Sequence, residues 1–329
     1  MVAPRPFAYS LADYAALSRL LAAVWPDRDS SVPALQHLDR HHRDGYFFQR
    51  FVIELDGALV AACDVGEPAD SYRPGKYAVD LAVMPAWRRH GLGAALYDHM
   101  LCELARRSPA LTMLACRTRE DQPQSVRFLA QRAFVQVMRS PMSRLDVPRF
   151  DFAPFAGVIP KVEAGGVQLY SLAQLAIMDA GWRRKIYELD WECTLDEPLP
   201  DTPTQSSFEH YAAEVFENPD FLPDAWFVAV DGGACVGMTA TNRNAQNPQQ
   251  LDTVFTGIVR SHRRRGLATA LKLLAIDYAH RNGYTSILAD NEEHNPMYQL
   301  NLALGFAPQP ALLFFHKQVS TQIRMEAGV

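Results

Sequence analysis

The pattern of apolar residues predicts short strands and amphipathic helices in alternation. In the first half, apolar runs and two-residue alternation predict strands at 7–10, 51–55, 59–64, 77–84, 111–117 and 134–138. Apolar residues at helical spacing predict helices at 13–25, 32–42, 91–107 and 123–132. Asp56-Gly57, between two of these strands, is typical of a tight hairpin turn. The first half is therefore expected to form a sheet flanked by helices.

The second half repeats this order. Its apolar pattern predicts strands at 167–170, 226–230, 234–241, 253–259 and 285–289, and closing strands at Phe306 and 312–319. Helices are expected at 172–189, 208–217, 266–281 and 294–304. Asp231-Gly232-Gly233 predicts a second hairpin. Both halves are thus expected to have the same architecture.

Equivalent landmarks keep nearly constant spacing between the halves. Gly91 and Gly266 are 175 residues apart, and Ala133-Phe134 lies 172 residues before Gly305-Phe306. A proline- and glycine-rich stretch at 148–165 separates the halves and predicts a linker. We therefore expect one fold, duplicated, with domains at 1–147 and 166–329.

Each half carries a basic, glycine-containing loop between a predicted strand and a predicted helix. The loops read Arg88-Arg89-His90-Gly91-Leu92-Gly93 and Arg263-Arg264-Arg265-Gly266-Leu267-Ala268. Such a loop points backbone amides and a helix N-terminus at one spot, which favours a phosphate. Solvated surface charge is the plainer interpretation of three arginines in a row. A dinucleotide-binding loop is the other rival, but it requires a third glycine where the chain has Leu96.

Composition narrows the possible functions. The chain has 329 residues, 48% of them hydrophobic and 21% charged, as expected of two globular domains. Residues 1–150 carry 19 basic and 16 acidic side chains, and the remainder 13 and 21, so no clustered basic face predicts a nucleic-acid partner. No apolar run is long enough for a membrane helix, and no signal peptide is evident, so a cytoplasmic protein is expected.

Neither the cysteines nor the histidines suggest a metal site. The five cysteines include no C-x-x-C pair, and they are interpreted as reduced, buried thiols. His37, His41 and His42 have helical spacing without cysteine or carboxylate partners in a metal-binding pattern. No metal is therefore expected.

The element order and both loops resemble the GCN5-related N-acetyltransferase (GNAT) superfamily, twice over. Its loop motif, Arg/Gln-x-x-Gly-x-Gly/Ala, matches both basic loops, and its last helix ends in Gly-Phe, as at Gly305-Phe306. The resemblance implies an α/β (α+β) class, with two tandem acyl-CoA N-acyltransferase folds. Each would be a mixed, mostly antiparallel twisted sheet flanked by helices. The tandem arrangement is similar to that of mycothiol-synthase-like acetyltransferases.

The resemblance implies acetyl-CoA as the acyl donor. The loop amides would bind its diphosphate, and the end of the preceding strand would pair with its pantetheine arm. Asparagines of the second half would hydrogen-bond the pantetheine or the sulfur. The residues implied in this role are Leu81, Val83, Arg88, Arg89, His90, Gly91, Leu92 and Gly93 in the first half and Gly257, Val259, Arg264, Arg265, Gly266, Leu267, Ala268, Asn291 and Asn295 in the second.

Three residues of the second half are candidates for catalysis. Asp252 begins the strand before the loop, where the family often has the base that deprotonates the amine; a surface acid is the alternative. The family's tyrosine acid falls at Asn301, which we interpret as a hydrogen-bonding group. Tyr298, one turn earlier, is a substitute acid or a core residue. The first half has Leu129 at the tyrosine position and no acid at the base position.

We therefore expect the second domain to transfer acetyl from acetyl-CoA to a primary amine of a small molecule, by direct attack in a ternary complex. The first domain would be degenerate or non-catalytic. Residues 186–242 contain 12 acidic side chains and no lysine or arginine, and these acids could attract a cationic acceptor. A non-catalytic acyl-CoA sensor, or catalysis in the first domain, remains the alternative. A monomer or homodimer is expected, without nucleic-acid or membrane partners.

Overall fold

The computed structural model describes residues 3–42, 45–107 and 110–319, which form two compact units. Of these described residues, the first unit takes those up to 139, 200–204 and 312–319, and the second takes 140–199 and 205–311. Segment 200–204 joins the first unit because Asp201 forms an ion pair with the buried Lys76 at 2.6 Å. No helix in the described part of the chain combines the length and apolarity needed to cross a bilayer.

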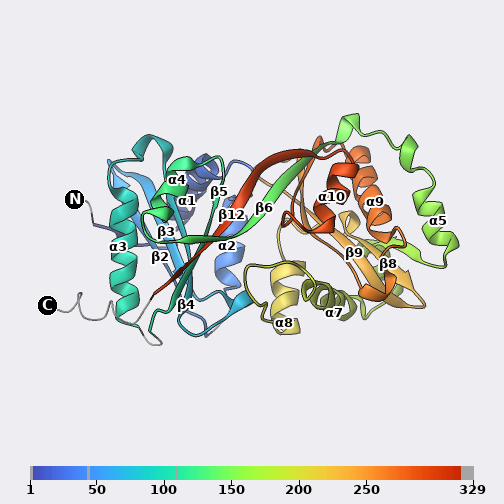
Figure 1. Cartoon of the computed structure of the whole chain (residues 1–329), viewed down its shortest axis with the longest axis horizontal. Helices are drawn as coiled ribbons and strands as arrows, with labels where there is room; N and C mark the ends of the chain where they lie inside the picture. The colour runs from blue at the N-terminus through green and yellow to red at the C-terminus, as the bar shows by residue number, and fades with distance from the viewer. Residues whose placement is uncertain (1–2, 43–44, 108–109, 320–329) are drawn as a thin grey trace. The chain divides into compact units, whose positions relative to one another are not determined.

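The first unit is a mixed sheet with helices on both faces (Figure 1). Its strands follow the order β1-β2-β3-β4-β5, and residues 312–318 of β12 pair antiparallel with β5. Of the strand pairings described in this unit, that of β4 with β5 is the parallel one. The elements are β1 (Arg5–Pro6), α1 (Leu11–Val24), α2 (Val32–Arg40), β2 (Phe48–Leu55), β3 (Ala58–Gly66), β4 (Lys76–Val83), α3 (Leu92–Ala105), β5 (Met113–Arg119) and α4 (Pro123–Ala130). Strands β6 (Val135–Asp146) and β12 (Ala307–Gln318) each have residues in both units.

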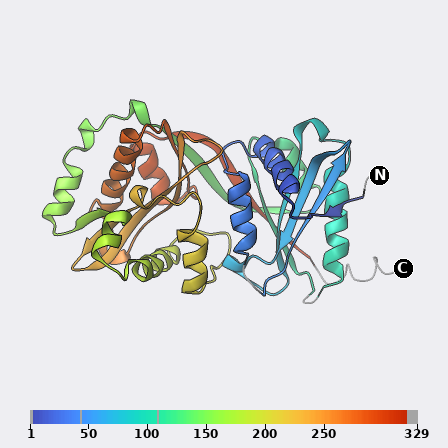
Figure 2. The ribbon, with the colours of Figure 1, turned by 180° about the vertical axis from the view of Figure 1, so that it is seen from behind.

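Alternation along the strands explains why both faces are covered. Val52 of β2 packs in one cluster with Leu17 of α1 and Leu35 of α2, whereas its neighbour Phe51 contacts His99 of α3. Figure 2 shows the two blue helices, α1 and α2, lying over the strands of this unit. The opposite face is therefore left to α3, which begins at the basic loop.

The second unit has the same design. Its strands follow the order β11-β10-β9-β8-β7, with residues 142–146 of β6 antiparallel to β11. Among the pairings described for this unit, that of β10 with β11 is the parallel one. A mixed, mostly antiparallel sheet is thereby confirmed in both units. The elements are α5 (Val158–Ala164), β7 (Gln168–Ser171), α6 (Leu172–Met178), α7 (Trp182–Thr194), α8 (Phe208–Tyr211), β8 (Phe227–Asp231), β9 (Ala234–Arg243), β10 (Gln250–Ile258), α9 (Leu267–Arg281), β11 (Ser286–Asp290) and α10 (Pro296–Ala303).

Some local expectations differ from the structure. The strand expected at 7–10 lies earlier, at β1, because Tyr9 has a positive φ of 57° that ends an extended run. The helix expected at 172–189 is two helices, since the side chain of Asp179 accepts a hydrogen bond from the amide of Gly181 at the break. The helix expected at 208–217 is α8 followed by a π-helical turn at Ala212–Phe216. Residues 148–165, the expected linker, carry α5.

Candidate functional site

Both basic loops have the same backbone conformation. Arg89 and Gly91 have positive φ values of 69° and 80°, and Arg264 and Gly266 have values of 63° and 85°. Gly91 and Gly266 are the N-cap residues of α3 and α9, and neither offers a side chain to cap the helix amides. A left-handed residue before such a helix start gathers backbone N–H groups into an anion-binding concavity. The predicted strand–loop–helix geometry is confirmed in both units.

The first arginine of each loop ties the loop to the preceding strand. Arg88 Nε donates to the carbonyl of Val83 at 3.3 Å, and Arg263 Nε donates to the carbonyl of Ile258 at 2.9 Å. Ile258 is therefore the structural counterpart of Val83. Sequence reasoning had placed Val259 in that position, one residue later.

Beside each loop, the two parallel strands stop pairing before the loop begins. β4 pairs with β5 only from Lys76 to Val79, and β10 pairs with β11 only from Gln250 to Asp252. The backbone of β4 at Leu81–Val83 is thus unpaired on the β5 side. We call this stretch of β4 the first strand gap, and the corresponding end of β10, residues 253–258, the second strand gap. An extended ligand can add to a strand edge of this kind through main-chain hydrogen bonds.

The first strand gap opens into a cavity of about 180 Å³. Its lining includes five residues expected to bind acetyl-CoA: Leu81, Val83, Arg88, Arg89 and Gly93. A Cβ atom added at Gly93 would lie 3.5 Å or more from its nearest neighbours, so the glycine leaves room above the strand. Sequence reasoning missed the lining from β5, α4 and the turn between them, because only the sheet topology brings it here: Cys116, Arg117, Thr118, Arg119, Gln122, Gln124, Ser125, Phe128 and Leu129.

The second strand gap is more tightly packed. A Cβ atom added at Gly257 would lie 2.6 Å from Cys193 Cβ and 2.7 Å from Phe255. Helix α7 therefore approaches the strand where the resemblance places the pantetheine arm, and glycine is the residue that permits this approach. Val259, Leu267 and Ala268 belong to or pack on the buried core beneath the loop.

The charges around the two loops are compensated differently. Arg88 Nη1 donates to the neutral Gln122, and His90, which is exposed, contacts the carbonyl of Arg88. In the second unit Arg260 and Arg263 both donate to Asp196. The hydrogen bond from Arg260 has the largest effect, and together with the one from Arg263 it lowers the pKa of Asp196 to about 2. His262 and Arg265 lie 3.1 and 3.5 Å from Asp231.

Asp252 lies at the start of β10, held by two amides. Asn244 Nδ2 donates to Oδ2 at 2.8 Å, and Gln250 Nε2 donates to Oδ1 at 2.6 Å. Arg144 in turn donates to Gln250 Oε1 at 2.7 Å. The carboxylate is thereby fixed in orientation beside the second strand gap. Asn244 and Gln250 are supporting residues that sequence reasoning did not single out.

The four candidate residues on and before α10 have distinct surroundings. Asn301 is fully buried; its Nδ2 donates to Asn291 Oδ1 at 2.8 Å, while its own Oδ1 has no hydrogen-bond partner. Asn295 caps the helix by accepting from the amide of Met297 at 2.9 Å. Tyr298 is half-buried one turn before Asn301. Asn301 and Asn291 are thus brought together, and Asn301 retains an unused buried acceptor.

Two carboxyl groups of the acidic segment have perturbed pKa values. Burial raises the pKa of Asp190 to about 6, against a hydrogen bond from Tyr211 that lowers it. Desolvation raises the pKa of Glu197 to about 7, and the negative charges of Asp290 and Asp190 add to this shift. These groups lie at the end of α7 and on the loop that follows it. A cationic group placed among them would favour their ionised forms.

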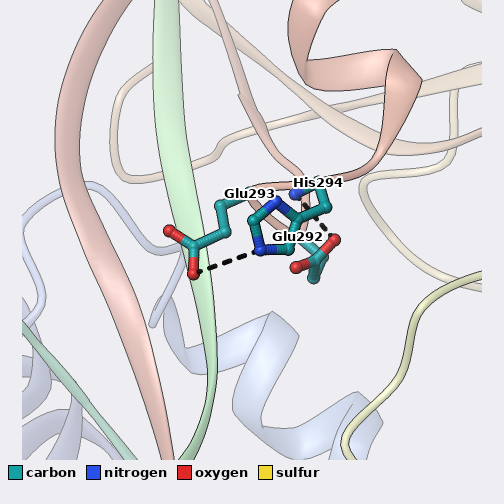
Figure 3. Close-up of side chains that lie close together, drawn as sticks. All are labelled: Glu292, Glu293 and His294. Carbon is teal, nitrogen blue, oxygen red and sulfur yellow. Dashed lines mark hydrogen bonds and ion pairs between the residues drawn. The ribbon is translucent and has the colours of Figure 1, made fainter.

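One acidic cluster lies on the loop between β11 and α10. Glu292, Glu293 and His294 place their ligand atoms within 4.8 Å of one another (Figure 3). The amide of His294 donates to Glu292 Oε2 at 2.8 Å, which gives the cluster a local structural role. His294 is largely exposed, and exposed acidic groups of this kind are common without an ion. It supports no metal assignment.

The comparisons with known proteins agree with this architecture. The model of the acetyltransferase (GNAT) family matches residues 14–134 and 183–306, most of both halves. The chain belongs to this family of acetyltransferases, with two family domains in tandem. It is 27% identical over 274 residues to a mycothiol acetyltransferase of Thermobifida fusca (strain YX), covering 80% of each chain.

Solved structures show the same tandem fold. A tandem GNAT protein from the clavulanic acid biosynthesis pathway aligns with a TM-score of 0.74 and 23% identity, covering 97% of this chain and 98% of that one. A GCN5-related N-acetyltransferase from Sphaerobacter thermophilus aligns with a TM-score of 0.63 and 19% identity, covering 96% and 95%. Identities this low establish the fold of the chain alone.

Proposed function

We propose that this protein transfers an acetyl group from acetyl-CoA to a primary amine of a small molecule. The observation that carries the proposal is the pair of matching loops, each with left-handed residues at Arg89 and Gly91 or at Arg264 and Gly266. Each loop stands at the end of a strand whose edge is unpaired on one side. Backbone amides would hold the diphosphate, and the strand edge would hold the pantetheine arm.

We assign the reaction to the second unit because the groups suited to acyl transfer surround its strand gap. A free alkylammonium has a pKa of ~10 and cannot attack a thioester until it loses a proton. Asp252, oriented by Asn244 and Gln250, would take that proton directly or through one water. An amide at the end of β10 would stabilise the oxyanion that forms. Tyr298 is one candidate for protonating the sulfur.

The first unit would bind acetyl-CoA without turning it over. Its cavity contains the loop arginines and is otherwise lined mainly by neutral side chains, including Leu129 where the second unit has Asn301. The presence of this cavity beside Arg88 and Arg89 also favours a second candidate, in which catalysis occurs in the first unit. The two assignments differ in which loop turnover requires.

The acceptor is proposed to be cationic before it reacts. Burial raises the pKa values of Asp190 and Glu197, and the negative charges of Asp290 and Asp190 add to the shift at Glu197, so these carboxyl groups repel one another when they are ionised. An ammonium group would relieve that repulsion. The acceptor KM is therefore expected to fall as the pH rises through about 6 to 7, where these groups ionise.

The test measures thiol release from acetyl-CoA with and without a panel of small amines. Amine-dependent release supports the proposal, whereas binding without release at any amine would identify an acyl-CoA sensor. Neutral or acidic acceptors that outcompete amines would remove the acceptor assignment. Trapping an acetyl-enzyme would contradict direct attack in a ternary complex.

A further inference from the structure

Helix α9 carries a lysine at a position where its counterpart in the first unit carries a tyrosine. Tyr97 and Lys272 are each six residues after the left-handed N-cap glycine of their helix, Gly91 or Gly266. Each lies near the phenylalanine that follows the last helix of its unit. The ring of Tyr97 lies 6.3 Å from that of Phe134, and Lys272 Nζ lies 5.8 Å from the ring of Phe306. The two side chains are therefore structural equivalents.

The same argument pairs Leu129 with Asn301. The amide of Phe134 donates to the carbonyl of Leu129 at 3.1 Å, and the amide of Phe306 donates to that of Asn301 at 3.0 Å. In the first unit Tyr97, Leu129 and Phe134 all line the cavity beside the loop. In the second unit, Lys272 and Asn301 thus occupy the positions whose counterparts line the cavity of the first unit.

Both side chains lack a partner that such a group usually has in a protein interior. Lys272 is only 4% exposed, and no acidic residue in the described ranges forms an ion pair with it. Asn301 is fully buried with an unpartnered Oδ1. In the first unit, by contrast, the hydroxyl of Tyr97 accepts a hydrogen bond from Lys317 at 3.0 Å. A buried ammonium without an anion is costly, so its retention points to an anion that arrives during function.

We propose that Lys272 is the proton donor to the leaving sulfur of coenzyme A in the second unit. The inference rests on the proposed function. As the amine nitrogen forms its bond to the thioester carbon, the C–S bond breaks and its electron pair goes to sulfur. The ammonium of Lys272 gives this sulfur a proton, and solvent later restores it. The anion is thus present only when the bond breaks, which explains why the resting protein contains none.

The chemistry of the neighbouring groups agrees with this role. Asn301 occupies the position of the family's tyrosine acid, but an amide cannot act as a proton donor to a thiolate. Burial lowers the pKa of Lys272 to about 8, and it is the single cause of that shift. A thiol such as that of coenzyme A has a pKa of ~8.5, so proton transfer between the lysine and the thiol is closely balanced.

The test compares two acetyl donors in Lys272→Met, with the full-length protein and a saturating amine. With acetyl-CoA, kcat should fall about 100-fold, in the range measured for loss of a general acid. With S-acetyl-4-nitrothiophenol, whose thiol leaves without a proton, the loss should be under about threefold on the same scale. The wild-type kcat with acetyl-CoA should decline above pH about 8, and the variant should lack this decline.

Controls separate proton donation from other roles. Lys161→Met, which removes an exposed lysine of α5, should match the wild type with both donors. Lys272→Arg retains the charge but holds its proton too tightly, so it should resemble Lys272→Met; full activity in Lys272→Arg would overturn the proposal. Equal losses with both donors would also overturn it. A preference for acyl-CoA donors that end in a carboxylate would overturn it as well. So would a loss of kcat that depends on the acetyl donor in Tyr298→Phe and not in Lys272→Met. Absence of thiol release by the wild type would refute the proposed function itself.

Discussion

The two loops share one backbone conformation and differ in almost everything around it. Gly91 and Gly266 have φ values of 80° and 85°, and each begins a helix directly after a basic loop. The first loop adjoins an open cavity that neutral and basic side chains line. The second adjoins Cys193 packed on Gly257, the buried Lys272, and arginines paired to Asp196.

The backbone of the two loops is the same while the side chains around them differ, so the features needed for the fold can be told apart from those needed for the proposed chemistry. The anion-binding concavity of each loop, called the cradle below, depends on the shape of the backbone. The left-handed residues therefore preserve it in both copies even where the side chains differ. Proton transfer depends on side chains, and those differ between the units at equivalent positions. Under the proposed function, both copies would bind acetyl-CoA through the loop, and only the second would supply acid–base groups.

The largest expected effect comes from placing a carboxylate in each cradle in turn. Gly266→Asp forces a side chain into the left-handed region and repels a diphosphate, so turnover should fall at least about 100-fold. Gly91→Asp should leave turnover within about threefold but remove one of two coenzyme A sites, and its matched position makes it the control. Steady-state kinetics and isothermal titration calorimetry measure the two effects. A reversed result would move catalysis to the first unit.

The next effect is expected at Asp252. Asp252→Asn removes the proposed base but retains its size, and kcat should fall about 100-fold while the KM for acetyl-CoA changes little. The activity of the variant should recover partly at high pH, where more of the amine is already unprotonated. The rate as a function of pH, together with the melting temperature as a check on folding, is the measurement. An unchanged kcat would make Asp252 a structural residue of the Asn244–Gln250 network.

Local chemistry made much of the fold predictable. Asp56-Gly57 forms the expected hairpin turn with both residues at positive φ, and both basic loops lie at strand-to-helix junctions. Turns and caps are encoded in adjacent residues, so they are visible in the sequence. The break at 179–181 was missed because apolar residues continue on both sides of it, and a side-chain hydrogen bond from Gly181 to Asp179 stabilises the break.

The site was less predictable because it depends on contacts between distant segments. The lining of the first cavity by β5 and α4 follows from strand order, and Asp196 reaches Arg260 across 64 residues. The residues on either side of Lys272 along α9 are all apolar or small. Sequence alone therefore does not show whether this lysine lies on the surface or is buried. Only its counterpart Tyr97, aligned through the N-cap glycines, shows which space it enters.

The contrast at Tyr97 and Lys272 also predicts a difference in stability. Because burial lowers the pKa of Lys272 from 10.5 to about 8, the folded state holds this proton less tightly than the unfolded state. Lys272→Met should therefore be more stable at pH 7, by up to about 3 kcal/mol at 1.36 kcal/mol per pKa unit. The gain should shrink as the pH rises from about 8 to 10.5, where the unfolded state also loses the proton.

Urea unfolding of both proteins across this pH range measures the gain. A residue that lowers stability and raises activity is expected at a functional site. If Lys272→Met instead destabilised the protein at pH 7, the ammonium would have a stabilising partner in solution. The argument for an anion that forms during the reaction would then fail.

The smallest effect is expected at Asp196, which supplies an internal anion to the second loop. Asp196→Asn leaves Arg260 and Arg263 without that counter-charge, so the positive potential near Gly266 should rise. The KM for acetyl-CoA should fall by about threefold at low salt, and the gain should disappear near 0.5 M salt because these arginines are exposed and screened. Asp146→Asn, an exposed carboxylate at the end of β6, is the matched control for net charge. A higher KM in Asp196→Asn would mean that the ion pairs hold the second loop in its binding conformation. The additional acidic residue beside this loop would then serve to stabilise its structure and not to tune its charge.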